Sequence, residues 1–134
     1  MVKMSVVYKG EKHCELVHEP SKAKIDTDAP KDNGGRGAAF SPTDLVGAAL
    51  ASCIVTTMAL VAERNGIPFE GASADVSKEM IADPRRIGAL PVNVTMSAKL
   101  TPEQRTKLEH AAEHCPVHKS LHPDVQMPIT FKYV

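Results

Sequence analysis

A run of eighteen residues without a charged side chain, LVGAALASCIVTTMALVA at 45–62, most constrains what this 134-residue chain can fold into. The run meets the lower length limit of a membrane span. However, half of it is Ala, Gly, Ser and Thr, which insert weakly, and no aromatic belt flanks it. A lone span would also leave the flanking segments without a core. The run therefore predicts a long central helix of a folded protein, buried on all faces. Gly47, Ala51 and Ser52 would permit close packing against another helix or a partner subunit.

Both ends of this helix carry recognisable signals. Ser41 is suited to the N-cap, Pro42 to the first helical position and Asp44 to the third, which makes a capping box with Asp in place of the usual Glu or Gln. The helix is predicted to run from about Pro42 to Asn65, with Gly66 just past its end.

Three short, partly alternating runs precede the helix and are separated by Gly or Pro-Ser. They read KMSVVYKG, KHCELVHE and KAKIDTDAP. This pattern predicts an N-terminal β-meander. The next segment, 30–42, is dense in Gly, Pro, Asn and Asp and is typical of a loop.

After the helix, residues 69–83 and 89–100 alternate as strands, joined by the turn-like DPRRIGAL. Segment 100–115 opens with a second capping box, formed by Thr101, Pro102 and Gln104. Its helical spacing places one face inward, made of Leu108, Ala111, Ala112 and Cys115. The closing VQMPITFKYV is a strand whose Pro128 favours an edge or a bulge. A meander, a central helix and a strand-strand-helix-strand half predict an α+β fold, as one domain over 1–134.

The composition excludes several classes of function. Sixteen basic residues balance sixteen acidic ones, which argues against a partner recruited by bulk charge, such as nucleic acid or an anionic membrane. Aromatic residues make up 4% of the chain and Trp is absent, so stacking platforms for single strands are lacking. The N-terminal residues show no apolar export signal. We therefore expect a reducing, cytoplasmic location, where a cysteine pair is more often catalytic or metal-binding than a structural disulfide.

Cys115 lies in the tract AEHCPVHKSLHP at 112–123. Pro116 suits the first position of a new short helix, so Cys115 is predicted to be its N-cap. Its sulfur would then lie near free backbone N–H groups and the positive end of the helix dipole. We expect this position to lower the pKa of the thiol.

The same tract contains spacings that zinc sites use, because His118 and His122 are four residues apart and Cys115 and His118 are three apart. A structural zinc site needs four ligands, and no second such tract completes it. The closing ligands would have to be distant ones, for example Cys14, His13 or His18. On the residues alone, metal binding, a thiol site and ordinary packing all stay open, as does the role of His114, His118 and His122.

Cys53 lies midway along the apolar helix. By default a buried cysteine is a small hydrophobic residue. A thiol in mid-helix gains nothing from a helix N-terminus, so reactivity would require a nearby cation to stabilise its thiolate. The candidates are Arg36 in the glycine-rich loop, Arg85 and Arg86.

FSPTDLVGAALASC at 40–53 and AAEHCPVHKSLHPDVQMPITFKY at 111–133 together resemble the OsmC/Ohr family of osmotically inducible and organic hydroperoxide resistance proteins. That family shows a Pro-x-x-Leu helix start leading to a buried cysteine, followed later by a Cys-Pro motif. The matching residues here are Pro42, Leu45 and Cys53, then Cys115, Pro116, Val117, His118 and Leu121. The order of elements matches across nearly the whole chain.

The resemblance implies a thiol-dependent peroxidase that reduces organic hydroperoxides in stress defence, without a metal or an organic cofactor. Cys53 would be the peroxidatic residue that becomes a sulfenic acid. Cys115 would resolve it as an intramolecular disulfide, which an external dithiol then reduces. The resemblance also implies an OsmC-like fold in an intertwined homodimer, with active sites at the subunit interface.

Two positions depart from the best-characterised peroxidase branch of the family. There, a Glu directly after the helix-start Pro orients the Arg that stabilises the thiolate. Here Thr43 occupies that place, and the nearest carboxylate, Asp44, is turned by about 100° around the helix. Arg36 is the best counterpart of the Arg. The candidate catalytic residues are thus Cys53, Cys115, Arg36 and Asp44. The two departures from the family pattern predict a divergent OsmC-like protein with a different substrate or a weak peroxidase activity.

An alternative from another class is a non-catalytic protein that binds a small apolar ligand in the same interface pocket. Its cysteines would be inert toward peroxide. The expected partners of the enzyme are a second copy of the chain, an organic hydroperoxide and an external dithiol, with neither nucleic acid nor a membrane.

Overall fold

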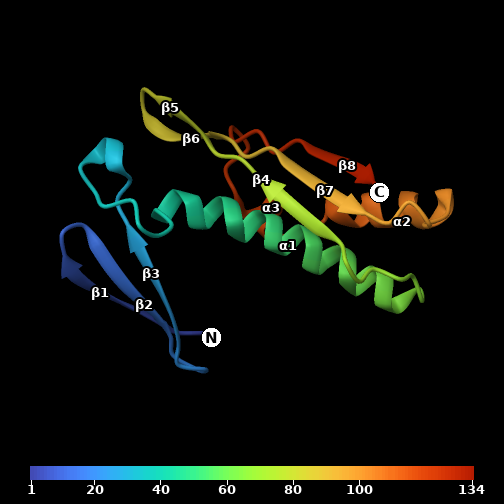
Figure 1. The fold of residues 1–134 in the computed structure, drawn as a ribbon, viewed down its shortest axis with the longest axis horizontal. Coiled ribbons are helices and arrows are strands. Elements are labelled where there is room, and N and C mark those ends of the chain that lie inside the picture. The colour runs from blue at the N-terminus through green and yellow to red at the C-terminus, as the bar shows by residue number, and fades with distance from the viewer. The chain divides into compact units, whose positions relative to one another are not determined.

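The computed structural model describes all residues, 1–134, and Figure 1 shows their elements. The chain forms two compact units, Met1–Leu45 and Val46–Val134. The chain contains β-strands, α-helices and a 3-10 helix, which confirms the α+β class.

The first unit contains an antiparallel sheet with the strand order β1-β2-β3, which confirms the predicted meander. Its strands are β1 (Met4–Gly10), β2 (His13–His18) and β3 (Ala23–Asp28). In this register Val6 lies opposite Leu16, and Leu16 lies opposite Ile25, so these three apolar side chains share one face. Val6 is 61% exposed and Ile25 is 52% exposed. Within the unit, this apolar face is therefore not covered.

The glycine-rich segment folds back on the end of β3, after a short 3-10 turn, η1 (Lys31–Asn33). The Gly37 N–H donates to the Ala29 carbonyl at 3.2 Å. At Gly35 a Cβ would lie 1.9 Å from the same carbonyl oxygen. Only glycine fits this close approach, which keeps the loop packed against the strand that precedes it.

Helix α1 (Pro42–Arg64) begins and ends as predicted. The Asp44 N–H donates to Ser41 Oγ at 3.1 Å and the Ser41 N–H donates to Asp44 Oδ2 at 3.0 Å, so the capping box is complete. At the other end Gly66 has a φ of +61°, and the Ile67 N–H donates to the Ala62 carbonyl at 2.9 Å. This is the backbone pattern of a Schellman motif, which stops the helix.

The prediction that α1 is buried on all faces is wrong for the chain by itself. Leu50, Ile54 and Met58, spaced four apart on one face, are fully buried, whereas Ser52 and Leu60 on other faces are exposed. By length and composition the helix could cross a membrane. Its buried stripe, however, forms part of the core of the second unit. The apolar composition of α1 does not show that the second unit packs against only one face of the helix.

The sheet of the second unit has the order β4-β7-β8, with β4 (Ser73–Val76), β7 (Val92–Met96) and β8 (Ile129–Tyr133). The central strand, β7, is antiparallel to β4 and parallel to β8. Its alternate side chains enter the core that α1 also enters, and they are Val92, Val94 and Met96. β8 is an edge strand, as Pro128 just before it predicts.

The segment between β4 and β7 differs from the prediction. DPRRIGAL is not simply a turn, because its residues 85–89 form β6 (Arg85–Ala89), which pairs with β5 (Glu79–Ala82) in a separate two-stranded sheet. The predicted single strand over 69–83 is thus two strands. Gly88 is needed in the hairpin, because a Cβ there would lie 2.6 Å from the Ile81 side chain.

The crossover from β7 to the parallel β8 contains helices α2 (Pro102–Ala112) and α3 (Pro116–Ser120). Thr101 and Gln104 form the predicted capping box of α2. The predicted inner face of α2 is buried and continues to the start of α3 through Leu108, Ala111, Ala112 and Cys115. The crossover therefore brings α3 to the core of the unit.

Candidate active site

Two elements of the second unit bring Cys53 and Cys115 together. Cys53 lies on α1, one residue before the buried Ile54, and packs against the core. Cys115 is the N-cap of α3, as predicted, and its Sγ accepts the N–H of His118 at 3.4 Å. The two side chains are near enough for Cys53 to affect the ionisation of Cys115. Both are free thiols.

The two thiols differ in exposure. Cys115 is fully buried, whereas Cys53 is partly exposed. A reagent from solvent therefore has access to Cys53, and Cys115 has access to the sulfur of Cys53. An exposed sulfur beside a buried sulfur is the arrangement in which oxidation of the first can lead to a disulfide with the second.

The prediction of a lowered pKa for Cys115 is wrong. Burial raises the pKa of this thiol above its ordinary value, and the neighbouring Cys53 side chain and its charge raise it further. The backbone N–H groups of His118 and Val117 lower the pKa, as the helix start predicts, but their effect is smaller. Cys115 is consequently a protonated thiol at neutral pH.

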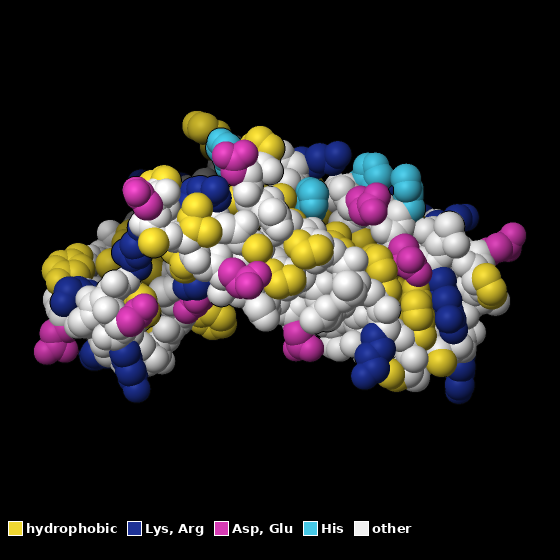
Figure 2. Space-filling view, turned by 90° about the horizontal axis from the view of Figure 1, so that it is seen from above, with side chains coloured by type: hydrophobic (Ala, Val, Ile, Leu, Met, Phe, Trp, Pro, Cys, Tyr) yellow, Lys and Arg dark blue, Asp and Glu magenta, His cyan; other side chains and the backbone are white.

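The rings of His114 and His122 make local contacts away from Cys115. His114 Nδ1 lies 2.9 Å from the His110 carbonyl oxygen and its ring lies 4.6 Å from the His110 ring. His122 Nδ1 accepts the Asp124 N–H at 3.0 Å and is exposed. Figure 2 shows histidine side chains at the surface. No three His, Cys, Asp or Glu side chains are grouped as metal ligands, so the tract supplies no ready-made zinc site.

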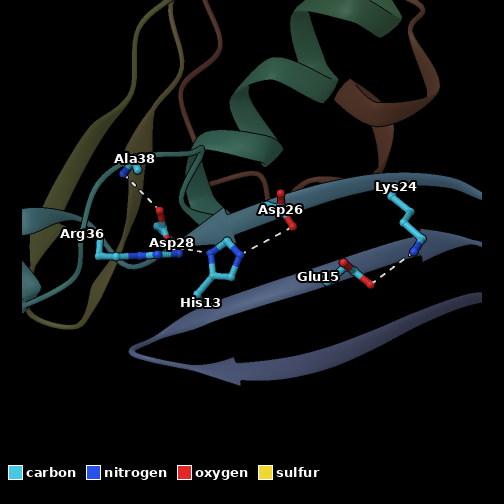
Figure 3. Close-up of polar contacts among 7 residues, drawn as sticks. All are labelled: His13, Glu15, Lys24, Asp26, Asp28, Arg36 and Ala38. Atoms are coloured by element: carbon cyan, nitrogen blue, oxygen red, sulfur yellow. Dashed lines mark hydrogen bonds and ion pairs between the residues drawn. The ribbon is translucent and has the colours of Figure 1, made fainter.

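Arg36 lies in the first unit and is held by Asp28 (Figure 3). Its Nη2 donates to Asp28 Oδ1 at 3.2 Å, and its side chain is 48% exposed. Of the other two candidate cations, Arg86 donates from Nη1 to the Ile87 carbonyl at 2.9 Å and Arg85 is exposed at the start of β6. Arg36 is thus the candidate whose guanidinium is paired with a buried carboxylate.

Asp44 and Thr43 lie in the first turn of α1. The Asp44 carboxylate accepts the Ser41 N–H, and the Thr43 hydroxyl lies 3.3 Å from the Ser41 hydroxyl. Both side chains are therefore engaged with the helix start. The structure shows the capping role that the one-residue shift from the family pattern predicts for Asp44.

Asp28 was not among the site residues that the sequence predicts, and His13 was a candidate only as a distant metal ligand. Asp28 is 1% exposed and its pKa is held below the usual range, chiefly by its hydrogen bond with His13. The available signal was the alternation of Asp26 and Asp28 at the end of a predicted strand. This signal could be interpreted only with the register of β2 and β3, which places His13 opposite Asp28.

Comparison with known proteins agrees with this architecture. The family model described as OsmC-like protein matches residues 34–130. No curated protein matches the sequence. Among solved structures, an osmotic stress induced and detoxification response protein from Psychrobacter arcticus 273-4 is 38% identical, with a TM-score of 0.93 over 98% of this chain and 96% of that one.

Two more distant structures share the fold. The organic hydroperoxide resistance protein OsmC from Legionella pneumophila is 19% identical, with a TM-score of 0.80 over 98% of this chain and 96% of that one. The organic hydroperoxide resistance protein OhrB of Bacillus subtilis is 21% identical, with a TM-score of 0.70 over 98% of each chain. From the family match and the relative at 38% identity, we conclude that this chain belongs to the OsmC-like protein family.

Proposed function

We propose that this protein is a thiol-dependent peroxidase that reduces organic hydroperoxides. The observation that carries the proposal is the pair of neighbouring thiols, Cys53 and Cys115, one partly exposed and one buried. The names of structural relatives, which include two organic hydroperoxide resistance proteins, support this class of substrate. Membership of the family supports a role in stress defence.

The reaction proceeds in three balanced steps. The Cys53 thiolate attacks one oxygen of the peroxide, so that an S–O bond forms, the O–O bond breaks and an alcohol leaves with a proton, which gives a Cys53 sulfenic acid. The Cys115 sulfur then attacks the Cys53 sulfur, the S–O bond breaks and water leaves with the Cys115 proton. An external dithiol reduces the Cys53–Cys115 disulfide to two thiols and is itself oxidised to a disulfide.

The protonation state of Cys115 fits its role in this cycle. Its raised pKa keeps a proton on the sulfur until the second step, where that proton is needed to release water. A protonated Cys115 can also donate a hydrogen bond to a Cys53 thiolate. By the family resemblance, we propose Arg36 as the cation that stabilises that thiolate. The cycle uses no metal and no organic cofactor.

We further propose that the chain, as one OsmC-like domain, forms a homodimer. Each unit leaves apolar side chains in solvent, and a second copy would cover them. In the first unit the exposed apolar side chains lie mainly on the sheet and include Met4, Val6, Tyr8 and Ile25. In the second unit α1 exposes Leu60. The dependence of the cycle on reduced thiols suits a cytoplasmic location.

The test is consumption of cumene hydroperoxide in the presence of dithiothreitol. We expect the wild type to consume the peroxide and Cys53→Ser to lose this activity. Cys14→Ser is the matched control, because Cys14 is a partly exposed cysteine on β2 of the other unit, and it should keep the activity. If the wild type consumes no peroxide, or if Cys53→Ser retains full activity, the proposal is wrong. Thiols that stay unchanged with peroxide would instead favour the ligand-binding alternative.

A further inference from the structure

His110 and His114 are two histidines whose rings lie against each other at the end of α2. His110 belongs to the last turn of this helix, and His114 lies in the turn that leads to α3. Because they are four residues apart, their side chains project from the same side of the chain. The ring centroids are 4.6 Å apart, and both residues are exposed. The proposed peroxidase cycle gives neither histidine a role.

The position of the His114 ring follows from the end of the helix. Carbonyl groups of a last helical turn lack their usual backbone donors four residues further on. The His114 N–H donates to the Ala111 carbonyl at 3.0 Å, and its ring Nδ1 lies 2.9 Å from the His110 carbonyl oxygen. Since a carbonyl oxygen can only accept, Nδ1 carries the hydrogen and Nε2 keeps its lone pair. Metal-binding histidines typically donate their other ring N–H in this way, often to a backbone carbonyl.

The His110 ring is available to a ligand. It touches the His114 ring, but it takes part in no hydrogen bond or ion pair. Lys107, one turn earlier, donates from Nζ to Asn65 Oδ1 at 3.1 Å, which holds its ammonium toward the end of α1. Glu113, next to His114 in the chain, is exposed and makes no ion pair. Together with the partial negative charge of the helix C-terminus, this carboxylate favours a cation at this end of α2.

The separation of the two rings fits a shared metal ion. Metal–nitrogen bonds to histidine are about 2.0 Å long, and a square-planar or tetragonal metal holds neighbouring ligands at about 90°. Two imidazole rings bound in this way have centroids roughly 4.5 Å apart. The rings of His110 and His114, at 4.6 Å, therefore need only to rotate in order to share one ion.

We propose that His110 and His114 bind one divalent transition-metal ion, of the class of Cu²⁺ or Ni²⁺, through Nε2 of His114 and a ring nitrogen of His110. Imidazole suits these metals, whereas Mg²⁺ and Ca²⁺ prefer oxygen ligands. Water fills the remaining coordination positions, so this is a surface site and not the four-ligand zinc site considered for the tract 112–123. The ion joins the last turn of α2 to the turn that precedes Cys115.

The experiment is a calorimetric titration with NiCl₂ at about pH 7.5, where an ordinary imidazole is neutral. Accessible thiols are first blocked with iodoacetamide, so that sulfur ligands do not contribute. We expect one ion per chain. His110→Ala and His114→Ala should each weaken binding by at least about tenfold, since loss of a group that merely orients a metal ligand already costs about 10- to 100-fold. The double variant should bind about as weakly as either single variant, because one imidazole cannot chelate.

His122→Ala is the matched control. His122 is also an exposed histidine, and its Nδ1 accepts the Asp124 N–H at 3.0 Å. This variant should leave the affinity for Ni²⁺ unchanged. Excess MgCl₂ should not compete with Ni²⁺.

The site is located by nuclear magnetic resonance of ¹⁵N-labelled protein. Substoichiometric Ni²⁺ should first perturb the backbone amide signals around His110 and His114. Perturbation that begins elsewhere, for example at His13 between Asp26 and Asp28, overturns the inference. A wild type that binds no Ni²⁺ overturns it as well. So does unchanged affinity in either single variant, in protein that retains its circular dichroism spectrum, because the two histidines would then not act as a pair.

Discussion

The thiol of Cys115 neighbours that of Cys53, although one starts the short helix α3 and the other lies in the middle of α1. The buried face of α1 and the buried face of α2 enter the same core, and α3 begins directly after α2. The contact between the thiols is therefore fixed by packing over the whole unit. A disulfide between them would join two elements that are already adjacent.

Replacing Cys115 should expose Cys53 to overoxidation. In Cys115→Ser the sulfenic acid of Cys53 has no thiol beside it, so excess cumene hydroperoxide should convert it to sulfinic acid. Peptide mass spectrometry of Cys53 after peroxide treatment without a reductant measures this. Wild type under the same conditions should keep Cys53 free of sulfinic acid. Equal overoxidation in wild type and Cys115→Ser would show that Cys115 does not protect Cys53.

The Asp28 carboxylate should stabilise the fold in a pH-dependent way. Its pKa in the folded protein lies below the ordinary value of 3.8, so its contribution is present above pH 3.8 and is lost as the pH falls through the lower, folded value. The free energy of unfolding, measured with urea, should be lower for Asp28→Asn than for wild type at pH 7. The difference should shrink below pH 3.8. A difference that grows toward acid pH would contradict this.

Tyr133 should contribute stability that is lost in alkali. The phenol donates to Glu109, and the guanidinium of Arg105 lies 4.0 Å from the ring centroid. Burial and the Glu109 carboxylate raise the pKa of Tyr133 to about 12, against an ordinary value of 10.0. The contribution is thus complete below pH 10 and declines as the pH rises toward 12.

Tyr133→Phe should therefore cost about 1 kcal/mol near neutral pH, measured by urea unfolding. The difference from wild type should narrow above pH 10. Tyr8→Phe, at an exposed tyrosine on the meander, serves as the control. If the difference in free energy of unfolding between wild type and Tyr133→Phe is as large above pH 10 as at neutral pH, the role of Glu109 is wrong.

The exposed apolar face of the meander should mediate dimerisation. Val6 and Ile25 lie on this face at 61% and 52% exposure. We expect light scattering after size-exclusion chromatography to give twice the 14.4 kDa chain mass for wild type. Val6→Lys with Ile25→Lys should shift the mass toward a single chain, because two buried charges would oppose association. Glu103→Lys, at an exposed position of α2, should not. A monomeric wild type would contradict the dimer.

The features that the sequence predicted well depend on residues close together in the chain. The capping boxes at Ser41 and Thr101 each span four residues, and the stop at Gly66 is equally local. Cys115 was placed correctly as an N-cap because Pro116 follows it directly. In each case a side chain or a backbone dihedral acts on backbone groups within one helical turn.

The errors and omissions concern interactions between distant parts of the chain. The pKa of Cys115 was assigned from the helix start, but burial and Cys53 outweigh the backbone N–H groups. The importance of Asp28 depends on His13, fifteen residues earlier, through the register of β2 and β3. The burial of α1 was overestimated because apolar composition does not state which neighbours are present. Such effects follow from tertiary packing, which local patterns do not encode.

The central claim, a peroxidase cycle through Cys53 and Cys115, is tested most directly by mapping disulfides after one equivalent of cumene hydroperoxide. The reduced protein is treated without a dithiol, alkylated to block remaining thiols, digested and analysed by mass spectrometry. We predict one intramolecular disulfide, between Cys53 and Cys115, with Cys14 recovered as the alkylated thiol. Recovery of Cys53 and Cys115 as free thiols, or of a disulfide that contains Cys14 instead, would contradict it.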